Sequence, residues 1–253
     1  MGGFRAIFFD NDGILVDTEP VFVQALEATF QEFGLKGNPK ELSQQNAARG
    51  GGVWQKFWTE SGQPESRALF TDRLHEIYCD FLQINVPRIK GVEDALQLLH
   101  KRIPMSIVTA SLREPFDTMH KQTGFLRFFD FWITRDGYTH SKPHPDPYNT
   151  AFLRMKQKLP DLKPSECLVL EDSERGVVSA KEAGMTCFAI PTEFTKTLDF
   201  SRADKVLKDV QEVLQFLHKI GCCRGSIPPD TDLLAGQILQ EQLDLFQSFA
   251  GFG

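Results

Sequence analysis

Two aspartates follow an apolar run near the start of the chain. The apolar residues 7–9 lead directly into Asp10, and Asp12 and Gly13 follow one residue later. A short apolar run that ends in Asp and Gly predicts a buried strand whose last residue projects an acid from the edge of a sheet. In an extended chain the two carboxylates lean the same way and repel each other, and a cation between them offsets that cost. Mg2+ suits such a site because it binds few carboxylates and leaves room for phosphate oxygens. A β-hairpin turn at Asp12-Gly13 is the alternative interpretation.

A second pair of acids, Glu171 and Asp172, follows the apolar run 168–170. Asp172 or Ser173 could cap the helix that the next residues predict. Two acids at the end of a buried strand could also complete a magnesium site with the first pair. The second interpretation requires that both strand ends lie at the same edge of one sheet.

Polar residues that could hold an anion follow a third apolar run. Thr109, Ala110 and Ser111 come directly after residues 105–108. Ser111 and Glu114 have the spacing of a capping box, which favours a helix-capping role for Ser111. Thr109 lies one step nearer the strand, and it is better placed to offer its hydroxyl and nearby backbone donors to an anion at the helix N-terminus.

A proline-rich loop over residues 140–148 carries a lysine and two histidines. A single loop lysine such as Lys142 is usually solvated, and the prolines fit a stiff, extended connection. His140, His144 and Asp146 could suggest a transition-metal site. No further ligand lies nearby in the sequence, so we do not predict such a site.

Strands and helices must alternate to bring these residues together. Apolar runs predict strands, and helical spacing predicts helices, over residues 92–99 (helix), 105–109 (strand), 114–124 (helix), 128–134 (strand), 147–158 (helix), 167–170 (strand), 174–184 (helix), 186–190 (strand), 205–207 (strand) and 209–219 (helix). This alternation implies an α/β fold, a Rossmann-like parallel sheet covered by helices on both faces. Ligands bind such sheets outside the carboxyl ends of the strands, where the acids and Thr109 fall.

The stretch 17–87 has a different pattern, with apolar residues at helical spacing throughout. We predict an inserted, all-helical cap domain of about four helices over 17–87, between the parts 1–16 and 88–220 of the α/β core. Within the cap, residues 49–52 form a glycine-rich loop with one cation, Arg49. Its planar guanidinium suits an anionic or hydroxyl-rich group, so Arg49 is a candidate substrate contact.

Taken together, these residues resemble the haloacid dehalogenase-like hydrolase superfamily, and the resemblance covers most of the chain. Four motifs occur in order: DNDGILVDTE at 10–19, the threonine of IVTAS at 107–111, the lysine of KPHPDPY at 142–148, and LEDS at 170–173 followed by Gly176-Val177. The helical insertion resembles the helical cap of that family. Asn11 is the one departure in the first motif, because an apolar residue is commoner there, and it leaves both acids intact.

The resemblance implies roles for these residues in catalysis. Asp10 would be the nucleophile that forms an aspartyl phosphate. Asp12 would protonate the leaving alcohol and then deprotonate the water that hydrolyses the intermediate. Thr109, Ala110 and Lys142 would hold the phosphate. Phosphoryl transfer depends mostly on positioning and charge stabilisation, which such groups supply.

The resemblance also implies Mg2+ as the cofactor. Asp10, the backbone carbonyl of Asp12, and Asp172 would hold the ion, and Glu171 would contribute directly or through water. The expected function is a magnesium-dependent phosphatase that acts on a small phosphorylated metabolite, such as a sugar or polyol phosphate.

Two alternatives to this function remain open. A sugar phosphate mutase of the β-phosphoglucomutase type shares all four motifs. That type has a histidine shortly after the first motif, whereas residues 18–24 contain none, which favours hydrolysis. Asp12 favours phosphate esters, because dehalogenases lack the second acid and phosphonatases replace it. A catalytically idle binding module is the alternative from another class, and the complete set of acids and the lysine argue against it.

The composition restricts the partners and the cellular location that we expect. The chain has 253 residues, of which 41% are hydrophobic and 25% charged, as in soluble globular proteins. A net charge of −6 without a basic block argues against nucleic acid, and no apolar run is long enough to cross a membrane. The five cysteines show no metal spacing, and the first strand leaves no room for a signal peptide, so we expect a cytoplasmic protein.

The tail 221–253 lies beyond the family pattern. It begins with Cys222-Cys223 and a Gly/Pro stretch, and it continues as an amphipathic pattern over about 232–249. We predict a helical C-terminal extension that folds back on the core, and a self-association surface or a frayed terminus is the alternative. A monomer or a homodimer is therefore expected.

Overall fold

The computed structural model describes residues 3–49, 52–62 and 67–221. Within them, six parallel strands form one sheet in the order β3-β2-β1-β4-β5-β6. The strands are β1 (Ala6–Phe9), β2 (Met105–Val108), β3 (Phe131–Ile133), β4 (Cys167–Glu171), β5 (Thr186–Ala189) and β6 (Lys205–Val206). The strand order reverses at β1, and a sheet of this kind opens a crevice at that point. The predicted Rossmann-like core is confirmed.

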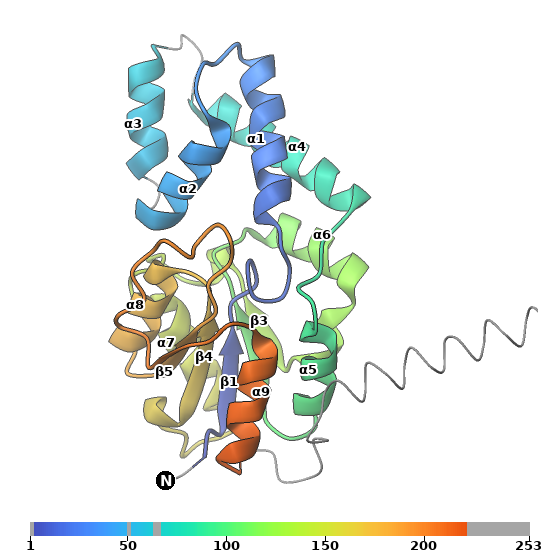
Figure 1. Cartoon of the computed structure of the whole chain (residues 1–253), viewed down its shortest axis with the longest axis vertical. Helices are drawn as coiled ribbons and strands as arrows, with labels where there is room; N and C mark the ends of the chain where they lie inside the picture. The colour runs from blue at the N-terminus through green and yellow to red at the C-terminus, as the bar shows by residue number, and fades with distance from the viewer. Residues whose placement is uncertain (1–2, 50–51, 63–66, 222–253) are drawn as a thin grey trace, which may run out of the picture.

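Helices cover both faces of the sheet (Figure 1). One face packs against α5 (Val92–Leu99), α6 (Arg113–Thr123) and α9 (Val210–Lys219), and the other packs against α7 (Asp146–Met155) and α8 (Glu174–Glu182). The side chains of β1 alternate between the two apolar clusters, with Ile7 and Phe9 in the first and Ala6 and Phe8 in the second. All four are fully buried, as expected for a strand covered on both sides.

The predicted strand over 128–134 is shorter in the structure. Residues Phe125–Phe128 form a 3-10 turn instead, and β3 begins at Phe131. Phe125 and Phe128 are buried in the same cluster as α5 and α9. Their apolar character therefore reflects the packing of the turn, and not a longer strand. Two further 3-10 turns cover Arg135–Gly137 and Pro164–Glu166.

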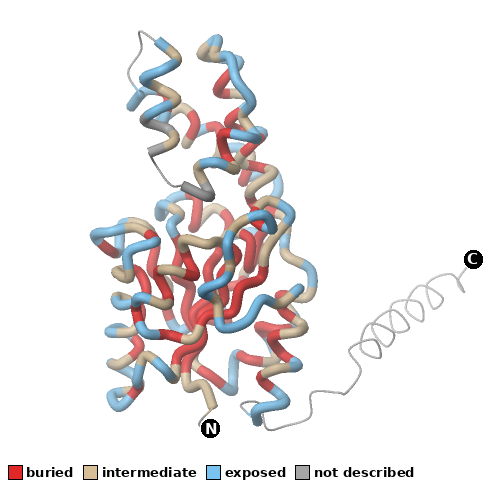
Figure 2. Tube along the Cα trace, turned by 60° about the vertical axis from the view of Figure 1, so that its left-hand side comes forward, coloured by how far each residue is buried: buried red, intermediate tan, exposed pale blue. Residues whose placement is uncertain are grey.

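Four helices form the inserted cap between β1 and α5, as predicted. They are α1 (Glu19–Glu32), α2 (Pro39–Arg49), α3 (Gly52–Ser61) and α4 (Arg67–Ile84). They have an apolar core of their own, which includes Leu26, Phe30, Phe70 and Leu74. Figure 1 shows the cap above the end of the sheet towards which β1 points. Buried residues gather in the sheet and in the interior of the cap (Figure 2).

The chain crosses between core and cap twice, and the two crossing segments lie side by side. The Asp17 amide donates to the Pro87 carbonyl at 2.9 Å, and Val16 pairs with Arg88 in an antiparallel bridge. The exact domain boundaries at 16/17 and 87/88 stay a prediction. The predicted helical tail lies outside the described residues. No helix within the described ranges is long and apolar enough to cross a membrane.

Candidate active site

The carboxyl ends of β1, β2 and β4 converge on a cleft of about 350 Å³ beneath the cap. The predicted site residues that line it are Asp10, Asp12, Thr109, Ala110, Lys142 and Asp172. Glu171 lies directly beside them, because its carboxylate contacts Lys142. The fold therefore brings together every predicted site residue of the core.

Lys142 is almost completely buried, with 4% of its surface exposed. Its Nζ lies 3.0 Å from Asp10 Oδ1 and 2.6 Å from Glu171 Oε1, and it donates to the Val108 carbonyl at 3.1 Å. Burial lowers the pKa of Lys142, but the two carboxylates outweigh that effect and raise it above its ordinary value. Lys142 is therefore a charged group inside the site, in contrast to the usual solvated loop lysine.

The Glu171 carboxylate is fully buried and has a donor at each oxygen. Besides Lys142, the Tyr148 hydroxyl donates to Oε1 at 2.5 Å, and the Ser173 hydroxyl donates to Oε2 at 3.0 Å. These contacts hold Glu171 as the partner of Lys142. They favour a contribution of Glu171 to a metal through water over direct ligation.

Two glycines allow the β4 acids to lie against the backbone. Gly13 has a φ of +78°, and a Cβ added there would lie 2.2 Å from Asp172 Oδ2. A Cβ added to Gly176 would lie 1.9 Å from Glu171 Cδ. A side chain at either position would displace a carboxylate, so both glycines are required by the site.

Asp10, Glu171 and Asp172 form a buried cluster in which each offers an oxygen within 4.8 Å of the others. Burial and the neighbouring Glu171 raise the pKa of Asp10 to about 8. Burial and the neighbouring Asp10 raise the pKa of Asp172 well above its ordinary value. Lys142 alone does not offset three buried carboxylates, and a divalent cation with oxygen ligands would. The cluster therefore fits Mg2+ in its charge and its donor atoms.

The Asp12 side chain lies among hydroxyl groups and is not a member of that cluster. The Thr18 hydroxyl donates to Oδ1, and the hydroxyls of Ser111 and Thr109 donate to Oδ2 at 2.7 and 3.3 Å. Of the atoms of Asp12, the main-chain carbonyl oxygen is therefore the one that remains a candidate metal ligand. The two aspartates of the first motif therefore have different environments, as different roles in catalysis require.

The predicted capping role of Ser111 is wrong. The N-cap of α6 is Leu112, and no side chain of the described residues caps this helix end. The Ser111 hydroxyl donates to Asp12 instead, and Glu114 contacts His75 of the cap. Because α6 begins one residue later than the capping box requires, the Ser111 hydroxyl is directed to the Asp12 carboxylate, and hydrogen bonds to ionised groups are the stronger ones.

Asn11, the departure from the family pattern, is buried and has a partner on α6. Its Oδ1 accepts from His120 Nε2 at 2.9 Å, and its Nδ2 donates to Asp12 Oδ2 at 3.3 Å. Burial lowers the pKa of His120 to about 4, so its ring is neutral near pH 7. The other ring nitrogen of His120, Nδ1, forms a hydrogen bond of 2.9 Å with the Thr123 hydroxyl. Asn11 thus connects α6 to the carboxylate of Asp12.

The cap contributes polar and aromatic side chains to the cleft: Glu19, Phe22, Asn46, His75 and Tyr78. Glu19 accepts from the Ser43 hydroxyl at 3.1 Å, and burial together with the charge of Asp12 raises the pKa of Glu19 to about 7. Arg49 ends α2, and its side chain lies outside the described part of the structure. Its role in substrate binding stays a prediction.

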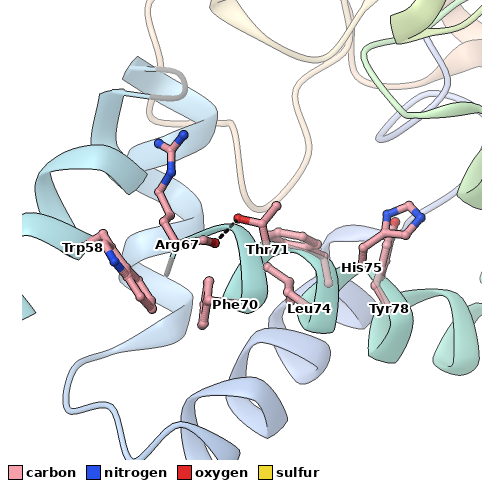
Figure 3. A pocket seen from close by; sticks show the side chains of 8 residues that line it. Trp58, Arg67, Phe70, Thr71, Leu74, His75 and Tyr78 are labelled. Atoms are coloured by element: carbon pink, nitrogen blue, oxygen red, sulfur yellow. Dashed lines mark hydrogen bonds between the residues drawn. The ribbon is translucent and has the colours of Figure 1, made fainter. Parts of the chain in front are cut away.

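A second cavity, of about 360 Å³, lies inside the cap and shares Phe22, His75 and Tyr78 with the cleft. Figure 3 shows Trp58 at one end of it and His75 and Tyr78 at the other. Its lining is mostly apolar, so the polar cleft continues into an aromatic annex within the cap.

His140, His144 and Asp146 also lie together, away from this cleft. Asp146 Oδ2 lies 2.7 Å from His140 Nδ1, and Asp146 Oδ1 lies 3.1 Å from His144 Nδ1. One carboxylate thus holds both exposed rings at the start of α7.

Several residues of the site were not predicted from the sequence. Besides the residues of the cap, they include Thr18, Glu19, Tyr148 and Arg175, the last of which donates through Nε to the Lys142 carbonyl at 3.1 Å. Thr18 and Glu19 lie within the first motif, and Tyr148 ends the KPHPDPY segment, so their positions gave a signal. Arg175 gave none.

A family model described as haloacid dehalogenase-like hydrolase matches residues 7–190 of the chain. The chain belongs to this family. Validoxylamine A 7'-phosphate phosphatase of Streptomyces hygroscopicus is 32% identical over 225 residues, which cover 83% of this chain and 96% of that protein. Pyrophosphatase PpaX of Oceanobacillus iheyensis is 29% identical over 215 residues, which cover 83% of this chain and 95% of that protein. The predicted family and the predicted enzyme class, a phosphoric monoester hydrolase, are confirmed.

Solved structures share the fold of this chain. CbbY from Rhodobacter sphaeroides in complex with phosphate superposes with a TM-score of 0.69 at 23% identity, covering 83% of this chain and 96% of that one. A predicted phosphoglycolate phosphatase from Haemophilus somnus gives a TM-score of 0.72 at 18% identity, covering 85% and 99%. At these identities the likeness shows the fold alone.

Proposed function

We propose that this haloacid dehalogenase-like hydrolase is a Mg2+-dependent phosphatase that hydrolyses a small phosphorylated metabolite through an aspartyl phosphate on Asp10. One observation carries the proposal. Asp10 lies 3.0 Å from the buried Lys142 ammonium, whereas the Asp12 carboxylate lies among the hydroxyls of Thr18, Ser111 and Thr109. This arrangement gives one carboxylate the surroundings of a nucleophile and the other those of a proton carrier.

Asp10 is oriented for attack by its own donors. Among the described residues, Lys142 Nζ and the Asn11 amide both engage Oδ1, at 3.0 and 2.8 Å. Oδ2 is the oxygen left to form the bond to phosphorus while the bond to the leaving alcohol breaks. The lysine also stabilises the charge that gathers on the phosphoryl oxygens.

Asp12 moves the protons. It gives a proton to the leaving alcohol, and it then takes one from the water that attacks the aspartyl phosphate, so it ends in its starting state. The hydroxyls of Ser111 and Thr109 hold its carboxylate in place at 2.7 and 3.3 Å. Thr109, Ala110 and Lys142 line the cleft, and we propose that they hold the phosphate.

Mg2+, when bound, supplies further positive charge to the phosphoryl oxygens. Asp10, Asp172 and the Asp12 carbonyl would hold it, and Glu171 would contribute through water. Asp172 lies directly against the first-motif loop at Gly13, which supports this assignment.

A sugar or polyol phosphate is the substrate class that we propose. Glu19 and Asn46 line the cap side of the cleft with groups that hydrogen-bond hydroxyls, and the buried Asn46 Oδ1 has no partner among the described residues. The names of two relatives agree with such a substrate. They are validoxylamine A 7'-phosphate phosphatase and the fructose-1-phosphate phosphatase YqaB of Escherichia coli, the second of which is 26% identical to this chain.

Phosphate release from a panel of sugar, polyol and aryl phosphates tests the proposal. We expect turnover that requires Mg2+ and that is lost in Asp10→Asn, which removes the nucleophile without removing volume. Hydroxylamine should trap the phosphorylated Asp10 as a hydroxamate that mass spectrometry locates. Asp204→Asn, at an exposed acid paired with Lys181, is the matched control. A folded Asp10→Asn variant with wild-type turnover would refute the assignment.

The same panel separates the alternatives. Interconversion of sugar phosphates without net phosphate release would indicate a mutase. Binding of phosphate esters by the wild type without any turnover would indicate a binding module.

We also propose that the enzyme acts in the cytoplasm on a small molecule, without nucleic-acid or membrane partners, as a monomer or homodimer. Cys79, Cys167 and Cys187 are buried and free, which supports a reducing compartment. The net charge of −6 argues against nucleic acid.

A further inference from the structure

Three metal-ligating side chains meet where the cap contacts the core. His75 and Cys79 belong to α4 of the cap, and Glu114 belongs to the first turn of α6. His75 Nε2 lies 3.0 Å from Glu114 Oε2 and 3.7 Å from Cys79 Sγ. A single ring nitrogen therefore faces both a carboxylate and a thiol.

The spacing of these atoms matches the ligands of a small tetrahedral ion. His75 and Cys79 are four residues apart, so one turn of α4 places them on one face. Zinc bonds of about 2.0–2.1 Å to nitrogen or oxygen and about 2.3 Å to sulfur place neighbouring ligand atoms about 3.3–3.6 Å apart. The observed separations, 3.0 and 3.7 Å, lie on either side of that range. Small side-chain shifts would admit an ion.

We propose that His75, Cys79 and Glu114 bind a divalent transition cation of the zinc type, which fastens the cap to the core. Sulfur, imidazole nitrogen and one carboxylate form a donor set for such an ion and not for Mg2+, which prefers oxygen alone. A water would complete the tetrahedron on the exposed side of Glu114.

Binding also changes the protonation of the thiol. Burial, with the charges of Glu114 and Asp80, raises the pKa of Cys79 to about 11, so the metal-free thiol keeps its proton at neutral pH. The ion takes the thiolate form and the proton passes to solvent, because a thiol that ligates zinc is deprotonated.

The position of the site gives it a consequence for catalysis. A cap must move away from the core to admit substrate and release product. An ion shared by α4 and α6 opposes that movement. His75 also lines the active-site cleft, in addition to the annex in the cap that Figure 3 shows. Bound zinc would therefore inhibit the enzyme. The inhibition rests on the proposed phosphatase function, whereas the binding of the ion does not.

Cobalt titration of the metal-free, full-length protein tests the binding. We expect a sulfur-to-cobalt charge-transfer absorption that saturates at one equivalent and is lost in Cys79→Ala. Glu114→Gln should weaken binding by at least about tenfold, because even groups outside a ligand set change metal affinity by that factor. Glu114 has a side chain that is 73% exposed, so this variant tests the site without disturbing the core.

The double variant Cys222→Ser/Cys223→Ser is the matched control, because it removes the two adjacent thiols of the tail. It should keep the absorption. A wild-type protein without the absorption, or an absorption that survives in Cys79→Ala, would overturn the proposal.

Zinc inhibition of phosphate release, measured at saturating Mg2+, tests the consequence. We expect inhibition that more Mg2+ does not relieve and that is at least about tenfold weaker in Cys79→Ala and Glu114→Gln. Inhibition that Mg2+ relieves equally in all three proteins would place zinc at the active-site acids and overturn the fastening role. If no substrate in the panel is turned over, the proposed function fails, and the cobalt titration still decides the metal site.

Discussion

Lys142 controls the charge balance of the active site. Its ammonium lies between Asp10 and Glu171, both buried, at 3.0 and 2.6 Å. Without it the two carboxylates would face each other in a medium where water cannot screen them. The lysine thus has a structural task that is separate from its proposed contact with the phosphate.

Lys142→Met should therefore destabilise the protein as well as inactivate it. Removing one partner of a buried ion pair typically costs about 3–5 kcal/mol, and we expect a loss of that size in the free energy of unfolding, measured by urea denaturation. The control is Lys158→Met, because Lys158 is 57% exposed and pairs with Asp130 at the surface. A surface pair contributes at most about 1 kcal/mol. Equal losses in the two variants would contradict this account of Lys142.

Ser111→Ala should lower activity and leave stability nearly unchanged. The variant removes the 2.7 Å hydrogen bond that positions the Asp12 carboxylate, the proposed proton carrier, and a misplaced reacting group can lower the rate by about 100-fold. We expect kcat to fall by about 10- to 100-fold. Thr118→Ala, on the same helix, is the control, because the Thr118 hydroxyl donates only to the Glu114 carbonyl in its own helix. A Ser111→Ala variant that loses stability but keeps kcat would restore the capping interpretation.

Residue roles could be predicted from the sequence where a motif places the residue at a strand end, as for Asp10 and Asp172. Ser111 was misassigned because the capping box is a local pattern, while its actual acceptor, Asp12, lies 99 residues earlier in the chain. Tyr148 and Arg175 contact Glu171 and Lys142 only through the folded core. The motif that contains Tyr148 placed it near the site without showing this contact, and nothing in the sequence indicated Arg175.

At the scale of the elements, α6 connects the core surface to the acid of the first motif. Its His120 ring is neutral, donates to Asn11 and lies beside Phe116 at a ring separation of 4.5 Å. Burial lowers the pKa of His120 from 6.5 to about 4. Between these two pH values the unfolded chain binds a proton that the folded protein does not, so stability falls as the pH is lowered through this window.

His120→Gln should reduce that loss of stability in acid. Each pKa unit corresponds to about 1.4 kcal/mol, so between pH 7.5 and pH 5 the wild type should lose about 2 kcal/mol more unfolding free energy than the variant. The glutamine amide can still donate to Asn11, so activity near pH 7.5 should be largely kept. His100→Gln, at an exposed histidine, should retain the wild-type pH dependence. Identical pH profiles for wild type and His120→Gln would contradict the assignment of the neutral ring.

The order and type of the elements could be predicted well, because apolar periodicity distinguishes buried strands from helices. Their ends could not. The predicted strand covers residues 128–134, although Phe128 belongs to a 3-10 turn packed under α5 and only residues 131–133 pair with β2. Both arrangements bury the same side chains, so the sequence pattern does not separate them.

At the scale of the whole molecule, the chain segment that leads into the cap reaches the second acid of the first motif through one hydroxyl. Thr18, the N-cap of α1, donates to Asp12, and Tyr78 of α4 lines the same cleft. Glu19, the next residue, and Phe22, one turn further along α1, line the same cleft. The position of the cap therefore affects the surroundings of Asp12 directly, because Thr18 lies at the start of the first cap helix.

The repulsion among the buried acids of the core lowers the free energy of unfolding. We therefore predict that bound Mg2+ stabilises the fold. Asp10, Glu171 and Asp172 repel one another in a buried cluster, and the raised pKa values of Asp10 and Asp172 express that cost. A ligand that binds only the folded state at about 100 times its Kd contributes about 2.7 kcal/mol. For a protein of this size that corresponds to a rise in Tm of about 5–10 °C.

Asp172→Asn should change the stability in opposite ways without and with Mg2+, relative to the wild type. Without metal the variant should be more stable than the wild type, because it removes a buried carboxylate whose charged form the fold disfavours. With Mg2+ it should gain little, because the ion loses a ligand. Asp204→Asn, at an exposed acid, should keep the full wild-type response to Mg2+. Thermal unfolding of the three proteins with chelator and with Mg2+ measures both effects. An equal rise in Tm for Asp172→Asn and the wild type would show that the stabilising ion binds elsewhere and would remove Asp172 from the metal site.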